Sequence, residues 1–153
     1  MKKNFLKVLF GLGAAAFISL NAVCAAEVTR LTDFALAKEL AAESKRPILL
    51  VFSGSDWCGW CKKLDKEVFA TEEFAEYADK NIIFVYADFP RRTQLSPELK
   101  KHNEELKKQY RIGGYPTVYL LRADGSVILK TGYQRGGAQN YIKHLESAIS
   151  KAK

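Results

Sequence analysis

The chain has 153 residues, of which 48% are hydrophobic and 27% are charged. This is enough for one packed domain, too little for two ordinary ones, and unlike a disordered chain. There are 24 basic and 17 acidic residues, and three of the lysines fall in residues 1–26, which leaves a net charge of +4 for the rest. Because this charge is mild and dispersed, we expect no nucleic-acid partner.

Residues 1–26 have the pattern of a secretory signal peptide. A basic start precedes an apolar stretch over 8–18, and small residues follow up to Ala26. This order predicts a signal peptide over 1–26, a single domain over 27–153, and a periplasmic or secreted protein. Two alternatives remain open. The first is a retained membrane anchor, although the apolar stretch is shorter than the ~20 residues of a spanning helix. The second is lipidation at Cys24.

The first half of the domain predicts a helix, a buried strand and two further helical segments. Thr32 or Asp33 is a suitable N-cap for a helix that begins at Phe34 and stops before Pro47. Residues 48–52 are five apolar residues in succession, which is typical of a strand buried on both faces. Helical segments are expected over 62–69 and over 71–78.

The second half predicts three more strands and two more helices. These elements are a strand over 82–87, a charged helix opened by Ser96 and Pro97, strands over 117–121 and 127–131, and a last helix over 137–149. Asp124-Gly125 between the last two strands is a hairpin signal. Helices alternating with strands before a hairpin predict an α/β domain, with a mixed central sheet and helices on both faces.

Two cysteines separated by two residues follow the first strand. Cys58 lies where this strand ends and a helix begins, so backbone N–H groups are expected to stabilise its thiolate. We therefore expect Cys58 to be an exposed nucleophile and Cys61, one turn later, to be the buried resolving thiol. Lys62 and Lys63 would lower the pKa of the thiol further, and Asp56 would oppose them.

Other uses of a cysteine pair are a metal site and a fixed structural disulfide. Zinc needs four ligands, and residues 27–153 offer only these two cysteines with His102 and His144, neither at ligand spacing. A copper carrier using His102 would lack methionine ligands. A structural bridge across so short a loop stabilises little. We therefore predict no metal and no organic cofactor.

Several landmarks give the sequence a resemblance to the thioredoxin superfamily over residues 48–149. They are Trp57-Cys58-Gly59-Trp60-Cys61-Lys62 after a buried strand, Gly114-Tyr115-Pro116-Thr117 before the next one, and Asp124-Gly125 in the last hairpin. The longer string over 53–69 is similar to a bacterial branch that is often found on exported proteins. The resemblance implies a thioredoxin fold.

The resemblance also implies roles for residues around the cysteines. Pro116 would be the family's cis-proline, packed against the cysteine pair, and the backbone of Tyr115 would pair with an extended client. Trp57 would form one wall of the docking surface, which would include Gly59 and an exposed Trp60.

The implied reaction is thiol–disulfide exchange. Cys58 attacks a disulfide in an exported client and Cys61 resolves the mixed disulfide, or the reverse steps insert a disulfide. A membrane or periplasmic redox partner would reset the pair, and the protein would be a monomer. The alternative is a peptide-binding module with the same fold and an inert disulfide.

Three features depart from thioredoxin. Gly59-Trp60 replaces Gly-Pro between the cysteines, so the direction of electron flow stays open. Thioredoxin has a buried aspartate in the strand before the motif, whereas residues 50–52 are apolar here. Either water or Asp56 would then take the proton of the resolving thiol, or resolution is slower. The segment 90–108 is longer than in thioredoxin and is expected to influence the choice of partner.

Overall fold

The structure is a computed structural model that describes residues 27–152, so the predicted signal peptide lies outside the described residues. Its elements are α1 (Phe34–Ser44), β1 (Ile48–Ser53), α2 (Gly59–Leu64), the π-helical turn η1 (Asp65–Phe69), α3 (Glu72–Asn81), β2 (Ile83–Asp88), α4 (Pro97–Gln109), β3 (Thr117–Leu121), β4 (Val127–Thr131) and α5 (Gly137–Lys151).

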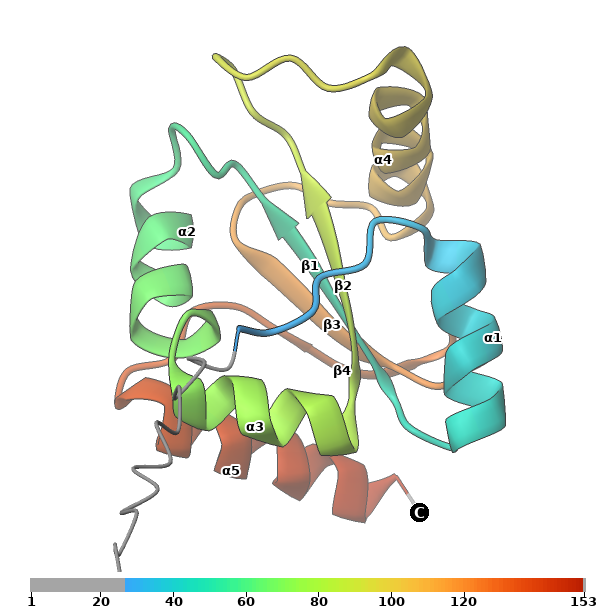
Figure 1. Ribbon diagram of the computed structural model, residues 1–153, viewed down its shortest axis with the longest axis vertical. Coiled ribbons are helices and arrows are strands. Elements are labelled where there is room, and N and C mark those ends of the chain that lie inside the picture. Colours follow the sequence, from blue (N-terminus) through green and yellow to red (C-terminus); the bar gives the residue numbers. More distant parts are fainter. Residues whose placement is uncertain (1–26, 153) are drawn as a thin grey trace, which may run out of the picture.

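The four strands form one mixed sheet with the order β2-β1-β3-β4 (Figure 1). β1 pairs with β2 in parallel and with β3 in antiparallel orientation, and β3 and β4 form the predicted hairpin. All six residues of β1 are buried, because β1 has a neighbouring strand on each side and helices cover both faces of the sheet. The segment that follows Ser53 is therefore attached to a central, fully buried strand of the sheet.

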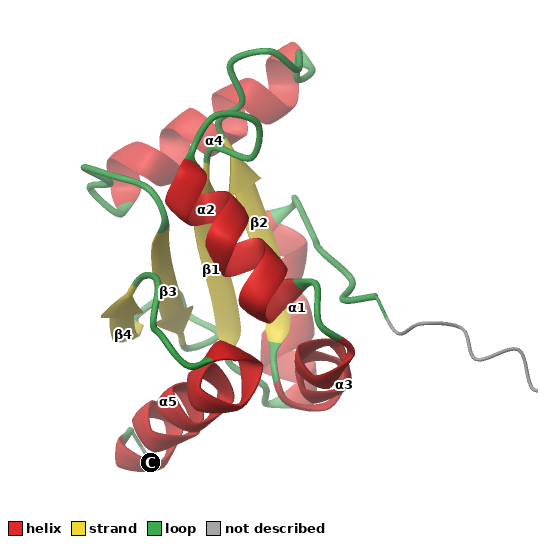
Figure 2. Ribbon diagram, turned by 90° about the vertical axis from the view of Figure 1, so that its left-hand side faces the viewer, coloured by secondary structure: helices red, strands yellow, loops and turns green. Residues whose placement is uncertain are grey.

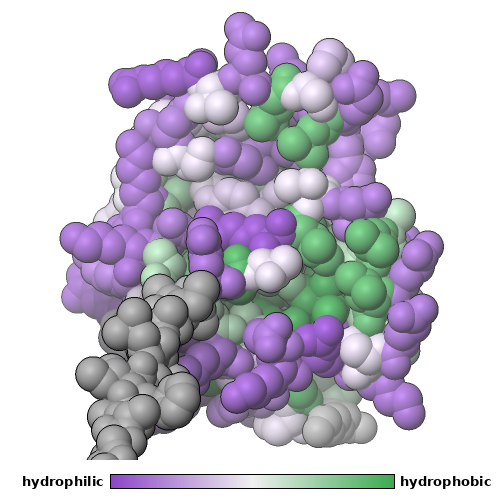
Figure 3. Space-filling view, viewed as in Figure 1, coloured by the Kyte–Doolittle hydropathy of each residue, from purple (hydrophilic) through white to green (hydrophobic). Residues whose placement is uncertain are grey.

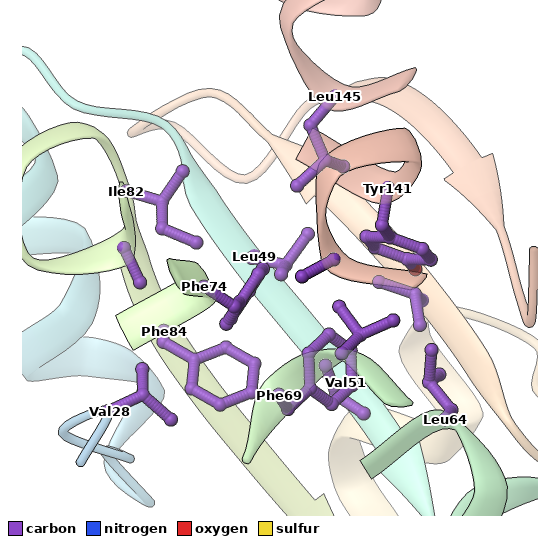
Figure 4. Close-up of a cluster of buried hydrophobic side chains, with 14 of the residues drawn as sticks. Val28, Leu49, Val51, Leu64, Phe69, Phe74, Ile82, Phe84, Tyr141 and Leu145 are labelled. Atoms are coloured by element: carbon purple, nitrogen blue, oxygen red, sulfur yellow. The ribbon is translucent and has the colours of Figure 1, made fainter. Parts of the chain in front are cut away.

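Helices cover both faces of the sheet, as the sequence predicts (Figure 2). On one face α2, η1, α3 and α5 enclose a cluster that includes Leu49, Val51, Leu64, Phe69, Phe74, Phe84, Tyr141 and Leu145 (Figure 4). On the other face α1 and α4 cover Phe34, Ile48, Leu50, Phe52, Val85, Leu106 and Tyr119. The alternation of side chains along β1 assigns its residues to the two clusters in turn.

Side-chain caps begin three of the helices at the predicted residues. The carboxylate of Asp33 accepts hydrogen bonds from the N–H groups of Ala35 and Leu36 at 2.8 and 3.1 Å. Thr71 caps α3, and Ser96 caps α4, with Pro97 in the first helical position. These local signals explain why the sequence predicts the helix starts so closely.

The edge strand β2 is partly covered by the first described residues. Leu31 pairs with Val85, and its carbonyl oxygen accepts a hydrogen bond from the N–H of Tyr86 at 2.8 Å.

The surface seen from the side of Figure 1 has an apolar area right of its centre, bordered by hydrophilic residues (Figure 3). Among residues 27–152, no helix combines the length and apolarity that a membrane crossing requires.

The helix after the cysteine motif departs from the prediction. Its helical residues begin at Gly59, three residues before the segment expected over 62–69, with Cys58 as the N-cap and Cys61 in the first turn. It continues as the π-helical turn η1, in which the N–H of Ala70 donates to the carbonyl of Asp65 at 2.8 Å. Periodicity alone does not reveal such a turn, because one additional residue changes the helical face only locally.

In α5, Tyr141 and Leu145 are buried, whereas Ile142 and Ile149 are half-buried.

Candidate active site

The cysteine pair closes a disulfide at the junction of β1 and α2. Cys58 and Cys61 are joined with their Cα atoms 5.2 Å apart. Cys58 is the N-cap of α2 in extended conformation, and its Sγ accepts a hydrogen bond from the N–H of Cys61 at 3.2 Å. The turn is closed by the N–H of Cys58, which donates to the carbonyl of Gly54 at 2.8 Å. A thiolate at the position of this Sγ would face a backbone donor, which favours the ionised form.

The relative burial of the two cysteines follows the expected order, but the expected exposure of Cys58 is wrong. Cys58 is 7% exposed and Cys61 is 3% exposed, so both are buried in the disulfide form.

The side chain of Trp57, the residue before Cys58, is held by several neighbours. Its indole N–H donates to the carbonyl of Phe89 at 2.8 Å, and its ring meets the ring of Tyr115 edge to face at 5.7 Å. The guanidinium of Arg91 lies over the same ring at 3.9 Å. The indole also lies against Gly54, where a Cβ atom would clash with it. Trp57 is thus held between the loop after β2 and the loop before β3.

Tyr115 and Pro116 lie at the same end of the sheet as the cysteines. Phe52 is paired with Thr117, so the residues just before β3 lie beside the residues just after β1. The Tyr115–Pro116 peptide bond is cis, as the resemblance implies. The ring of Tyr115 also packs against Phe89 at 5.3 Å, and burial raises the pKa of its hydroxyl.

Trp60 and Gly59 face outward on α2. Trp60 is 55% exposed, as expected, and its ring packs on Tyr133 at 5.2 Å. Gly59 has open space where a side chain would begin. The structure therefore brings Trp57, Tyr115 and Pro116 together on one side of the motif, whereas Trp60 lies with Tyr133.

Trp60 packs on a cluster of Lys63, Glu67 and Tyr133 that the sequence does not predict. The hydroxyl of Tyr133 donates to the carboxylate of Glu67 at 2.6 Å, and this hydrogen bond is the main reason why the pKa of Tyr133 is raised. The ammonium group of Lys63 lies 5.3 Å from the ring of Trp60 and 5.2 Å from that of Tyr133. Glu67 and Tyr133 are 66 residues apart, and no local pattern links them.

Asp56 anchors the loop that follows β2. Its carboxylate accepts hydrogen bonds from the N–H groups of Arg91, Arg92 and Thr93 at 2.6 to 3.1 Å. The bond from Arg91 contributes most to lowering the pKa of Asp56. A carboxylate with a lowered pKa is a poor proton acceptor. This argues against Asp56 taking the proton of Cys61 in place of the buried aspartate of thioredoxin. The ammonium of Lys62 donates to the carbonyl of Asp56 at 2.9 Å, so this lysine also supports the turn.

Both histidines have partners away from the cysteines. The ring of His102 accepts the N–H of Phe34 at 3.4 Å, and the ring of His144 lies 3.1 Å from the hydroxyl of Thr131. Within residues 27–152, no three histidine, cysteine, aspartate or glutamate side chains are grouped as metal ligands.

Comparison with known proteins places this site in a family. Residues 34–149 match the family described as a thioredoxin-like domain. The disulfide bond reductase DsbH of Chlamydia pneumoniae is 33% identical over 117 residues, which are 76% of this chain and 70% of DsbH. The thioredoxin-related protein DsbJ of the same organism is 28% identical over 127 residues, or 78% of this chain and 36% of DsbJ.

A solved structure shares the fold and a substantial part of the sequence. The DsbH oxidoreductase superposes with a TM-score of 0.78 at 30% identity, over 90% of this chain and 95% of that chain. The matched range contains both cysteines and all the docking residues that the sequence predicts. The chain therefore belongs to the thioredoxin-like family, and it is a thiol–disulfide oxidoreductase with the cysteine pair Cys58–Cys61.

Proposed function

We propose that the protein is an exported reductase of disulfides in client proteins. The observation that carries this proposal is the position of the Cys58 sulfur at the first turn of α2, where it accepts the N–H of Cys61. Similarity to a protein named disulfide bond reductase, at 33% identity, supports the reducing direction. The pattern of residues 1–26 supports export.

The reaction transfers two electrons to the client in two exchanges. The Cys58 thiolate attacks one sulfur of the client disulfide, and the other sulfur leaves as a thiolate and takes a proton. Cys61 then loses its proton and attacks Cys58 Sγ, which releases the second client thiol and forms the Cys58–Cys61 disulfide. A membrane or periplasmic redox partner returns two electrons and two protons to the pair. The protein acts as a monomer in this scheme.

The docking residues have separate roles in this proposal. The edge of the Tyr115–Pro116 segment pairs with the extended client chain, and Trp57 forms the adjacent wall. Gly59 leaves space for the client backbone beside the first turn of α2, and Trp60 offers it an exposed ring. The edge-to-face contact of Trp57 with Tyr115 supports a common surface for these groups.

Trapping of a mixed disulfide tests the reaction. A purified Cys61→Ser variant, mixed with a peptide that contains an intramolecular disulfide, should form a covalent adduct that dithiothreitol reverses. The Cys58→Ser variant is the matched control and should form no adduct at that position. Equal capture by both variants, or by neither, would contradict the assignment of Cys58 as the nucleophile.

The reduction potential of the pair tests the direction and the alternative function. Equilibration with glutathione or dithiothreitol should give a value near the reducing end of the family, about −270 mV, and not near the oxidising end, about −120 mV. A pair below about −300 mV that does not exchange would be a structural disulfide and would favour the peptide-binding module.

Export is tested on the full-length protein in a bacterial host. Mass spectrometry of the periplasmic fraction should show a mature N-terminus at or next to Glu27. A protein that stays intact in the cytoplasmic fraction would overturn this part of the proposal. A lipid-linked N-terminus at Cys24 in the membrane fraction would replace a free exported protein with an anchored one.

A further inference from the structure

The exposed ring of Trp60 packs on a residue from a distant part of the sequence. Trp60 is 55% exposed, and within residues 27–152 the one aromatic ring that packs on it is that of Tyr133, with 5.2 Å between the ring centres. We propose that Tyr133 is a positioning residue for the reaction, which fixes the Trp60 ring where a client meets it. This inference rests on the proposed function, in which Trp60 contacts the client.

Trp60, Lys63 and Glu67 share one face of the segment that α2 and η1 form. Their spacing of three and four residues brings side chains to the same side of a helix. The ammonium group of Lys63 lies 5.3 Å from the centre of the Trp60 ring and 5.2 Å from that of Tyr133. It also lies 3.9 Å from the carboxylate of Glu67. This face therefore offers Tyr133 an aromatic ring, a cation and a hydrogen-bond acceptor.

Glu67 fixes the ring of Tyr133 on this face. The hydroxyl of Tyr133 donates to Oε2 of Glu67 at 2.6 Å, a distance that is typical of a hydrogen bond to an ionised acceptor. The tyrosine is thus held by its hydroxyl on Glu67 and by its ring on Trp60. A ring fixed in this way restricts the rotation of the indole that packs on it.

The loop after β4 brings Tyr133 to this place from the side of the cis-proline. Gly132 lies against Pro116, since a Cβ atom on Gly132 would be 3.2 Å from the carbonyl oxygen of Pro116. The hydroxyl of Tyr141 donates to the carbonyl of Gly132 at 3.2 Å, which ties the loop to α5. The chain therefore passes beside Pro116 and places the next residue, Tyr133, on the ring of Trp60.

The rates of single and double variants test the role of Tyr133. The reduced protein is mixed with a peptide that has an intramolecular disulfide and leucines beside its cysteines, because Trp60 offers an apolar ring. Hydroxyethyl disulfide reports the exchange chemistry without a peptide, and the ratio of the two second-order rate constants is compared between variants. This ratio should fall about threefold to tenfold in Tyr133→Ala and by a similar factor in Trp60→Ala. The double variant should lose about as much as one single variant, since both changes remove the same contact with the client.

Tyr77→Ala is the matched control, because Tyr77 is also half-buried and lies on α3, away from the first turn of α2 (Figure 1). It should retain the ratio of the wild type. An equal loss in the two tyrosine variants would assign the effect to general destabilisation and would overturn the proposal. Losses in Trp60→Ala and Tyr133→Ala that multiply in the double variant would also overturn it, because the two residues would then act independently.

The mobility of the indole is measured without chemistry. The chain has two tryptophans, so the heteronuclear NOE of each indole N–H can be followed separately in the labelled, oxidised protein. The value for Trp60 should fall in Tyr133→Ala, whereas the value for Trp57, which is bonded to Phe89, should stay the same. An unchanged value for Trp60 would overturn the proposal.

Two changes at Glu67 test how Tyr133 itself is held. Glu67→Gln keeps an oxygen that accepts from the tyrosine hydroxyl and should retain the NOE of the Trp60 indole, whereas Glu67→Ala should lower it. Equal values in these two variants would contradict the role of Glu67. If the wild type does not reduce hydroxyethyl disulfide, the proposed function itself fails, whereas reduction with an unchanged ratio in Tyr133→Ala refutes only the role of Tyr133.

Discussion

The indole N–H of Trp57 donates to the carbonyl oxygen of Phe89, 32 residues later, at 2.8 Å. This bond connects the residue before the nucleophilic cysteine with the first residue after β2. It orients a ring that also meets Tyr115 and Arg91. The predicted docking residues Trp57 and Tyr115 are therefore held together by contacts between segments that are distant in sequence.

Replacement of Trp57 tests the contribution of this bond to stability. Trp57→Phe removes the donor and leaves the Phe89 carbonyl without it, so the free energy of unfolding should fall by about 0.5–1.5 kcal/mol. Urea denaturation measures this change. Trp60→Phe is the control, because Trp60 is 55% exposed. Its effect should stay within about 0.5 kcal/mol, and equal losses would contradict the interpretation.

Two glycines next to the motif should respond in opposite ways to the same change. Gly54→Ala places a Cβ atom 2.6 Å from the indole nitrogen of Trp57, so the ring must move, at a cost of about 1–3 kcal/mol. Gly59→Ala meets open space at the first helical position and should be neutral or stabilising by about 0.4–1 kcal/mol. Thermal unfolding of both variants checks the difference. A more stable Gly54→Ala protein would disprove the close packing of Trp57.

The hydrogen bonds to Asp56 should make its contribution to stability depend on pH. Its pKa is lowered from an ordinary value of 3.8, chiefly by the N–H of Arg91. A carboxyl whose pKa is lower in the folded protein stabilises it above the ordinary pKa, and this stabilisation is lost as the pH falls through the folded value. The advantage of the wild type over Asp56→Asn should therefore be full at neutral pH and should shrink below pH 3.8. Urea denaturation at a series of pH values measures it, and a constant difference would contradict it.

The aromatic centre of the larger core cluster should be the most sensitive part of the fold. Phe69 is 1% exposed and lies 5.0 Å from the ring of Phe74 and 5.1 Å from that of Phe84. Phe69→Ala should lower the free energy of unfolding by about 3–5 kcal/mol, because it opens a cavity that these rings cannot fill. Leu36→Ala, on the exposed face of α1, should change it by less than about 0.5 kcal/mol. If the two variants lost comparable free energy of unfolding, Phe69 would not be a central residue of the core.

The elements of the fold were predictable because their signals are local. Asp33 caps α1 as expected, and residues 48–52 form a strand that is buried on both faces. Asp124-Gly125 lies between two paired strands. Each of these predictions depends on residues that are close in sequence, whether the signal is a cap, an apolar run or a turn.

The surroundings of the cysteines were less predictable because they depend on distant segments. Cys58 was expected to be exposed and is buried. Asp56 is separated by 35 residues from Arg91, and Glu67 by 66 residues from Tyr133. Hydrogen bonds over such distances leave no periodic trace in a single sequence. The predicted docking roles of Gly59, Trp60 and Tyr115 remain predictions until a client is bound.

The loop after β2 is anchored through its main chain. Asp56 accepts from backbone N–H groups of residues 91–93, Trp57 donates to a backbone carbonyl, and so does Asn103. Because all of these anchors are main-chain atoms, the side chains of residues 92–95 can be replaced while the path of the loop stays the same. The path of the loop is thus independent of the side chains that residues 92–95 carry. Since the sequence predicts that segment 90–108 influences the choice of partner, redesigning residues 92–95 alone should change which clients are reduced, with the cysteines and their strand left untouched.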